Sequence, residues 1–131
     1  MEEKNEMMSG EALSPLVDVT PIELAKAIAD RLDEKKGNAV KVLAVGDKTS
    51  IADYFVLCTG NSSTHVKALA GEIEDYIGKR SVEPDNVEGR GTRSWIVLDY
   101  GNVIVHVFDR ESRDFYNLDK LYGDTIPVLE Y

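Results

Sequence analysis

Apolar and β-branched residues concentrate between positions 95 and 108, on either side of a Gly-Asn pair at 101–102. Two such runs around a two-residue turn that begins with glycine predict a β-hairpin. Pairing the residues that flank this turn sets the register, so that Trp95 faces Phe108. Because side chains alternate along a strand, one face of the hairpin is predicted to be wholly apolar and to belong to the core. That face carries Ile96, Leu98, Tyr100, Val103, Val105 and Val107.

The opposite face of the hairpin mixes large apolar groups with one carboxylate and one imidazole. It carries Trp95, Val97, Asp99, Ile104, His106 and Phe108. A face of this composition needs a cover, which is either a later segment of the chain or a binding partner. The residue pattern leaves these two interpretations open.

Two longer helices and two further strands are predicted before the hairpin. Thr20, Pro21 and Glu23 form the signature of a capping box, so the first helix is expected to begin there and to end at Gly37. Strands are predicted at 39–45 and 54–59, and the second is apolar on both faces, which is typical of a central strand. The second helix is expected over residues 64–77, where apolar residues recur with helical spacing.

The remaining segments predict edges and tails. Residues 79–92 are polar and contain Pro84, so they are expected to hold at most a short edge strand around Val87. A short amphipathic helical segment is predicted over 113–122. The domain is expected to span residues 19–124, between a disordered, dispensable acidic tail at 1–18 and a C-terminal tail at 125–131.

The predicted element order is α-β-β-α-β-β-β-α. This order indicates an α+β fold with a mixed sheet, in which the two long helices lie mainly on one sheet face. A chain of 131 residues is long enough for one domain with a substantial core.

The formal net charge of −9 changes the expected partners. An acidic domain offers no net cationic footprint for phosphates, so direct binding of free nucleic acid is not expected. A basic protein partner fits this charge better, although solubility alone also explains it. No apolar run is long enough to cross a bilayer and the N-terminus lacks a signal-like pattern, so we expect no membrane association and a cytoplasmic location.

The sequence provides no convincing catalytic or metal-binding constellation. A nucleotidyltransferase would combine a Gly-Ser loop, as at residues 60–63, with paired acids on the next strand. The available pair is Glu83 and Asp85, and Pro84 between them interrupts a strand. Cys58 lies within an apolar strand, and two histidines are too few for a metal site. We therefore expect a binding module with no cofactor, and keep a transferase with Glu83 and Asp85 as metal ligands as the alternative.

Five sequence blocks carry a resemblance to a known family. They read Asp-Tyr-Phe-Val-Leu-Cys-Thr-Gly-Asn-Ser at 53–62, Val-Lys-Ala-Leu-Ala at 66–70, Trp-Ile-Val-Leu-Asp-Tyr-Gly at 95–101, Val-His-Val-Phe at 105–108 and Arg-Asp-Phe-Tyr-Asn-Leu-Asp-Lys-Leu-Tyr-Gly-Asp at 113–124. Together they resemble the ribosomal silencing factor family, also called Iojap, over about residues 20–124. The chain departs from the family pattern at Thr64-His65, where Arg-Gln is common, and at Tyr122, where Trp is common.

The resemblance implies a fold related to the nucleotidyltransferases but without their catalytic acids. It implies a non-enzyme that binds protein fourteen of the large ribosomal subunit at the intersubunit face. There the protein would block joining of the small subunit and repress translation, and the free protein would often be a homodimer.

The predicted partner-binding surface combines aromatic anchors with acids at their rim, as is typical of protein interfaces. Its members are Trp95, Asp99, His106, Phe108, Asp114, Tyr116, Asp119 and Tyr122. The competing prediction places Trp95 and its neighbours in a second small core covered by the C-terminal helical segment.

Overall fold

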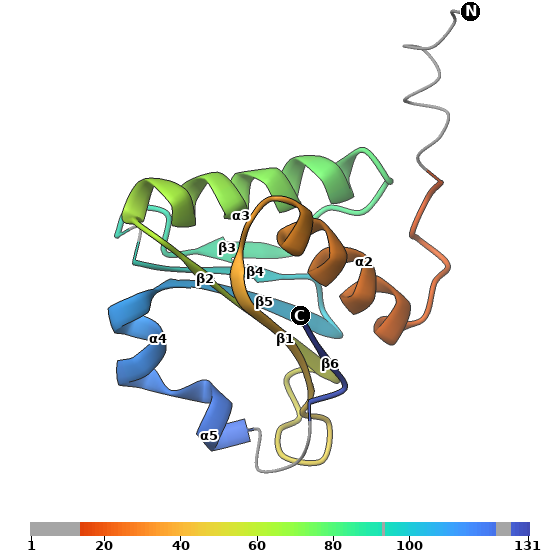
Figure 1. Ribbon diagram of the computed structural model, residues 1–131. Helices are drawn as coiled ribbons and strands as arrows, with labels where there is room; N and C mark the ends of the chain where they lie inside the picture. Colours follow the sequence, from red (N-terminus) through yellow and green to blue (C-terminus); the bar gives the residue numbers. More distant parts are fainter. Residues whose placement is uncertain (1–13, 93, 123–126) are drawn as a thin grey trace, which may run out of the picture.

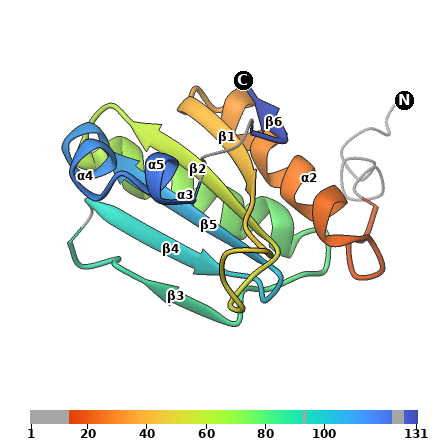
Figure 2. The ribbon, with the colours of Figure 1, turned by 90° about the horizontal axis from the view of Figure 1, so that it is seen from below.

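The computed structural model describes residues 14–92, 94–122 and 127–131, and its elements form a mixed sheet with helices on both faces (Figures 1 and 2). The six strands of this described part follow the order β3-β4-β5-β2-β1-β6 across the sheet. The elements are α2 (Pro21–Glu34), β1 (Asn38–Ala44), β2 (Tyr54–Gly60), α3 (Ser63–Gly78), β3 (Asn86–Glu88), β4 (Trp95–Asp99), β5 (Val103–Asp109), α4 (Arg110–Tyr116), α5 (Leu118–Tyr122) and β6 (Leu129–Glu130).

The capping box predicted for the first long helix is confirmed. The Thr20 hydroxyl accepts the Glu23 N–H at 3.4 Å, and the Glu23 carboxylate accepts the Thr20 N–H at 2.9 Å. The predicted end differs, because Lys36 and not Gly37 takes the left-handed conformation, with a φ of 73°. Gly37 is needed for a different reason: a Cβ at this position would lie 2.4 Å from the Cys58 sulfur.

The predicted hairpin and its register are also confirmed. Strands β4 and β5 are antiparallel, and Trp95 faces Phe108. At the turn, the Tyr100 N–H donates to the Val103 carbonyl at 2.9 Å. Gly101 adopts a φ of +87°, which a glycine tolerates without steric cost.

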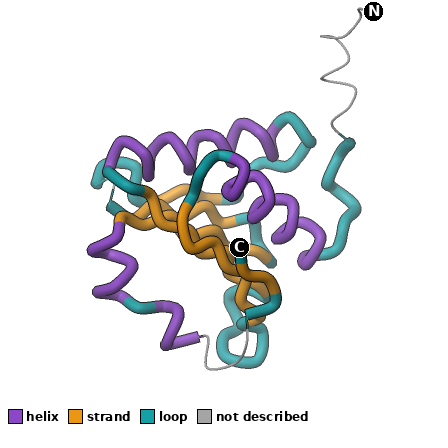
Figure 3. Tube along the Cα trace, in the orientation of Figure 1, coloured by secondary structure: helices purple, strands orange, loops and turns teal. Residues whose placement is uncertain are grey.

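Strand β2 occupies the predicted interior position, parallel to β5 and antiparallel to β1. Helices α2 and α3 cover one face of the sheet, as predicted, whereas α4 and α5 lie on the other face (Figure 3). The first core, between the sheet and the long helices, includes Leu24, Ile28, Leu32, Val56, Leu69, Ile73, Ile96, Leu98 and Val105. The second core lies on the opposite face and consists of Leu43, Val45, Ala52, Phe55, Leu57, Ile104, Phe108 and Leu118.

The C-terminal helical segment forms earlier than predicted and is divided. The Asp109 carboxylate accepts the Ser112 N–H at 2.8 Å and caps α4, so the helix begins at Arg110 and not at Arg113. Asn117 adopts a left-handed φ of 49° and separates α4 from α5. Leu118, the first residue of α5, is 8% exposed and inserts into the second core.

The described part of the predicted C-terminal tail adds a strand to the sheet. The Val128 N–H donates to the Val42 carbonyl at 2.8 Å, and the Tyr131 N–H donates to the Val40 carbonyl at 2.9 Å. These bonds place β6 against the outer edge of β1. A strand of two residues is too short to show a hydrophobic period, which is why the sequence pattern missed it.

The boundary at residue 18 for a disordered N-terminal tail is wrong for residues 14–18. Leu16 is 6% exposed within the first core, and its N–H donates to the Arg80 carbonyl at 2.8 Å. The Arg80 side chain donates to the Ser14 carbonyl, also at 2.8 Å. Residues 1–13 of the predicted tail, and Gly123 and Asp124 of the resemblance, lie outside the described residues.

Replacing Leu16 should therefore destabilise the domain. We expect Leu16→Ala to lower the free energy of unfolding by about 2 kcal/mol, since a buried leucine is truncated at the margin of the core. Val17→Ala is the matched control, because the neighbouring Val17 side chain is 59% exposed. Urea denaturation of both variants measures the difference. Equal stabilities would show that the segment from Ser14 onward is not docked.

Candidate functional site

A group of exposed aromatic side chains lies over the second core, on the side of the sheet that α4 and α5 cover. Phe115 is 77% exposed and Tyr116 is 49% exposed, while Trp95 and Tyr122 are partly buried against the second core. The Tyr116 ring lies 4.5 Å from the Trp95 ring and 5.0 Å from the Phe115 ring, between centroids. We call Trp95, Phe115, Tyr116 and Tyr122 the aromatic surface.

The Trp95 ring is fixed from beneath by two residues of β5. It stacks on Phe108 with 5.0 Å between ring centroids, and Phe108 itself is completely buried. Its indole N–H donates to Nδ1 of His106 at 3.2 Å. Trp95 therefore belongs to the edge of the second core and to the aromatic surface at the same time.

His106 has the hydrogen-bonding structural role that its strand position suggests. Burial lowers the pKa of its imidazole to about 4, so the ring is neutral at pH 7. Because Nδ1 accepts the Trp95 N–H, the proton of the neutral ring is on Nε2, and that buried atom has no partner among the described residues. His106 and Phe108, both predicted to be in the partner-binding surface, thus lie beneath it.

Asp119 of the predicted acidic rim is engaged within the chain. Its two carboxylate oxygens accept hydrogen bonds from the Arg113 guanidinium at 2.7 and 2.8 Å. Lys41 approaches the same carboxylate at 3.2 Å. The Arg113 hydrogen bonds, with a smaller effect from Lys41, lower the pKa of Asp119 to about 2.

The other two predicted acids occupy different places. Asp99 ends β4 at the hairpin turn, where its carboxylate accepts the Gly101 N–H at 2.8 Å. It lies four residues along the strand from Trp95, a separation of about 13 Å, so it is remote from the aromatic surface. Asp114 is exposed on α4 beside Phe115, as expected of a rim residue.

The loop at residues 60–63 caps a helix. The Ser62 hydroxyl accepts the His65 N–H at 3.1 Å and begins α3. Nδ1 of His65 accepts the Asn61 N–H at 2.9 Å, so this side chain closes the loop. His65, at which the sequence departs from the family pattern, therefore has a local structural role.

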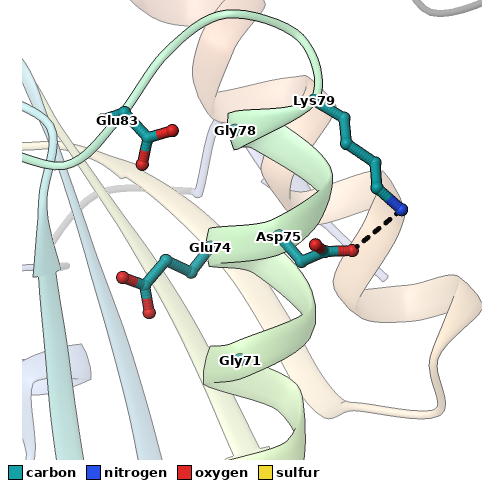
Figure 4. Close-up of a pocket in the computed structure, with 6 residues that line it drawn as sticks. All are labelled: Gly71, Glu74, Asp75, Gly78, Lys79 and Glu83. Carbon is teal, nitrogen blue, oxygen red and sulfur yellow. Dashed lines mark ion pairs between the residues drawn. The ribbon is translucent and has the colours of Figure 1, made fainter. Parts of the chain in front are cut away.

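Glu83 and Asp85, the alternative metal ligands, differ in their nearest glycine neighbours. Glu83 points towards the C-terminal end of α3, where it lines a pocket with Glu74, Asp75 and Lys79 (Figure 4). Its Oε2 lies 3.0 Å from where a Cβ of Gly78 would be, whereas Asp85 lies against Gly101 at the hairpin turn. Among the described residues, no group of three or more His, Cys, Asp or Glu side chains could hold a metal ion.

Cys58 is completely buried, and burial raises the pKa of its thiol to about 12, as for an inert core thiol. In the part of the chain that the structure describes, none of the helices combines the length and apolar character needed to cross a membrane.

Comparison with known proteins identifies the family. The family model described as "Ribosomal silencing factor during starvation" matches residues 18–130. The chain belongs to the ribosomal silencing factor family. Relatives named ribosomal silencing factor RsfS from Halalkalibacterium halodurans and Bacillus subtilis are each 37% identical. The alignments cover 82% and 77% of this chain and 92% and 86% of those relatives.

The fold agrees with this assignment. A crystal structure of a Chromobacterium violaceum protein is similar with a TM-score of 0.77 and 29% identity, and the match covers 83% of this chain and 91% of that chain. As a ribosomal silencing factor, the chain has a ribosome-associated silencing role with the ribosome as its partner. The relatives' names describe a regulatory role.

Sequence reasoning missed Arg113 as a residue of this candidate site. In the structure Arg113 is 8% exposed and its side chain binds Asp119. The two side chains are six residues apart, which does not place them on one face of a continuous helix. They meet only because the left-handed Asn117 redirects the chain between them.

The lowered pKa of Asp119 predicts an acid-dependent loss of stability. The folded-state pKa of about 2 lies below the ordinary value of 3.8, so the ionised carboxylate stabilises the fold above about pH 4. This contribution, about 1–2 kcal/mol, should be lost as pH falls from about 4 towards 2. Urea denaturation between pH 2 and 7 should show wild type and Asp119→Asn converging in stability at the acid end. A difference that stays constant with pH would contradict this role of the carboxylate.

Proposed function

We propose that this protein binds the large ribosomal subunit at its intersubunit face and blocks joining of the small subunit, thereby repressing translation. Membership of the ribosomal silencing factor family supports the ribosome as the partner. The single observation that supports the docking site is the aromatic surface, because exposed Tyr, Trp and Phe side chains on a rigid base are typical interface anchors.

The charge of the chain supports a basic protein as the contact on the large subunit. The net charge is −9, and Asp114 is exposed beside Phe115. Protein fourteen of the large subunit is the partner that the family resemblance implies, and a basic ribosomal protein would complement this charge. Rim charges of this kind chiefly raise the association rate and make it depend on salt.

We place this activity in the cytoplasm. We also propose that the free protein forms a homodimer through the same aromatic surface.

The exposed residue Phe115 offers a cleaner test than Trp95. Trp95 packs on Phe108 and bonds to His106, so Trp95→Ala should lose stability and binding together. Phe115 is 77% exposed, so Phe115→Ala should change the free energy of unfolding by less than about 0.5 kcal/mol.

We expect Phe115→Ala to weaken binding to purified large subunits by about tenfold or more, because truncating an aromatic anchor typically costs about 2 kcal/mol. The measurement is titration of large subunits with labelled protein, paired with thermal unfolding. Val17→Ala is the control, since it truncates another exposed apolar side chain, one that lies beside Pro21 and Leu24 of α2. Helix α2 covers the sheet face opposite α4 (Figure 1). Wild-type affinity in Phe115→Ala would contradict a docking site on α4.

Blocking of subunit joining is tested by mixing both subunits with the protein and separating them by sedimentation. The wild-type protein should lower the yield of joined ribosomes, and Phe115→Ala should restore it.

We propose that this effect needs no catalysis. Metal-dependent incorporation of a labelled nucleotide that Glu83→Ala or Asp85→Ala abolishes would contradict that part of the proposal.

A further inference from the structure

The two helices that carry most of the aromatic surface depend on contacts with the rest of the protein for their position. Helix α4 has seven residues and α5 has five, and helices of this length are unstable in isolation. Their arrangement therefore depends on contacts to the sheet. Besides aromatic packing, those contacts include the Asp109 cap, the buried Leu118 side chain, Arg113, and the ion pair between Lys41 on β1 and Asp119 on α5.

Arg113 makes the largest number of connections between elements at this site. Its Nη1 donates to the Thr59 hydroxyl on β2 at 2.8 Å, and its Nη2 donates to the Ala39 carbonyl on β1 at 3.0 Å. Its Nε and Nη2 bind the two oxygens of Asp119 on α5. One guanidinium thus joins α4, where Arg113 itself lies, to α5 and to two strands.

This geometry fixes α5 relative to α4. A bidentate arginine–carboxylate pair is directional, because two parallel N–H donors meet two oxygens in one plane. Phe115 and Tyr116 follow Arg113 on α4, while Tyr122 follows Asp119 on α5. The pair therefore sets the relative positions of the two halves of the aromatic surface across the left-handed Asn117.

A large contribution to stability does not explain this arrangement. The Arg113 side chain is 9% exposed and the Asp119 side chain 25%, and the attraction within such a partly buried ion pair is offset to a large extent by the cost of removing the charges from water. Replacing such a pair by apolar groups is often neutral in stability. Its directional effect, in contrast, has no apolar substitute.

We propose that Arg113 is a positioning residue of the docking surface: it holds α4 and α5 in the one arrangement that the ribosomal partner recognises, without touching the partner. This inference rests on the proposed function, because the positioned surface is the one proposed to bind the large subunit. When only a fraction of molecules has the competent arrangement, apparent affinity falls by that fraction.

Positioning residues and contact residues are expected to affect different rate constants of binding. Loss of a positioning residue lowers the competent fraction and thus the observed association rate, whereas the complex that does form dissociates normally. Loss of a contact residue such as Phe115 acts mainly on the dissociation rate. A purely structural role would lower thermal stability without separating the two rates.

The test uses Arg113→Met, which retains an unbranched aliphatic stem but removes all hydrogen-bond donors of the side chain. Arg110→Met is the matched control. Arg110 is exposed on the same helix and makes no side-chain hydrogen bond or ion pair to the described residues. Hydrogen exchange of the free protein is measured over residues 110–122, and binding kinetics are measured with purified large subunits. Asp119→Asn is the second variant, because it keeps the Arg113 bonds to Thr59 and Ala39 and remains informative if Arg113→Met does not fold.

We expect Arg113→Met to speed exchange over 110–122 and to slow association by about tenfold, with dissociation unchanged within about twofold. Asp119→Asn should change both in the same direction but less, and Arg110→Met should match the wild type. Wild-type exchange and association in Arg113→Met, or faster dissociation as in Phe115→Ala, would overturn the inference and leave the proposed function standing. If the wild-type protein itself does not bind large subunits, the proposed function fails, and faster exchange in Arg113→Met still supports the positioning of α4 and α5 by Arg113.

Discussion

Strands β2 and β5 lie parallel at the centre of the sheet, and side chains on both of their faces are buried. This pair requires a cover on each side, and the two covers differ in size. Helices α2 and α3, of 14 and 16 residues, close the first core. The second core is closed by two short helices and a few residues of the loops. The aromatic surface exists because this smaller cover leaves the outer parts of Trp95, Tyr116 and Tyr122 accessible.

The buried polar groups, like the helices, are distributed unequally between the two faces of the sheet. Three polar or charged residues of the described chain are buried, namely Thr59, His106 and Arg113. Arg113 binds Thr59, and His106 accepts the indole N–H of Trp95, so all three belong to the support of the short helices or of Trp95. Apolar packing alone permits several arrangements of similar energy, whereas hydrogen bonds to buried partners permit few. The polar residues therefore give this side of the sheet a defined geometry that its small apolar area cannot provide.

Local sequence signals are sufficient to predict those elements that are determined by residues close together in the chain. The capping box at Thr20 and the register of the hairpin depend on residues close together in the chain, and both were predicted correctly. Leu16 and β6 were missed because each is ordered by contacts with distant strands or helices and shows no period of its own. The aromatic members of the surface could be recognised from composition, but the sequence could not tell which lie on top and which lie beneath. Phe108 and His106 alternate with first-core residues in the same way as an exposed residue would. They are buried by long-range contacts within the second core, where both rings pack against Trp95 and His106 also packs against Phe55.

The most direct test of the account replaces Phe115 with a photo-crosslinking amino acid, with the same replacement at Val17 for comparison. Both side chains are exposed. Val17 lies beside α2 on the first-core side of the sheet, whereas Phe115 belongs to α4 on the other side. After irradiation with purified large subunits, the account predicts a crosslink from position 115 to one basic protein of the large subunit and none from position 17. Crosslinks from position 17 alone, or none from position 115 despite binding, would contradict the central claim that the aromatic surface docks on the large ribosomal subunit.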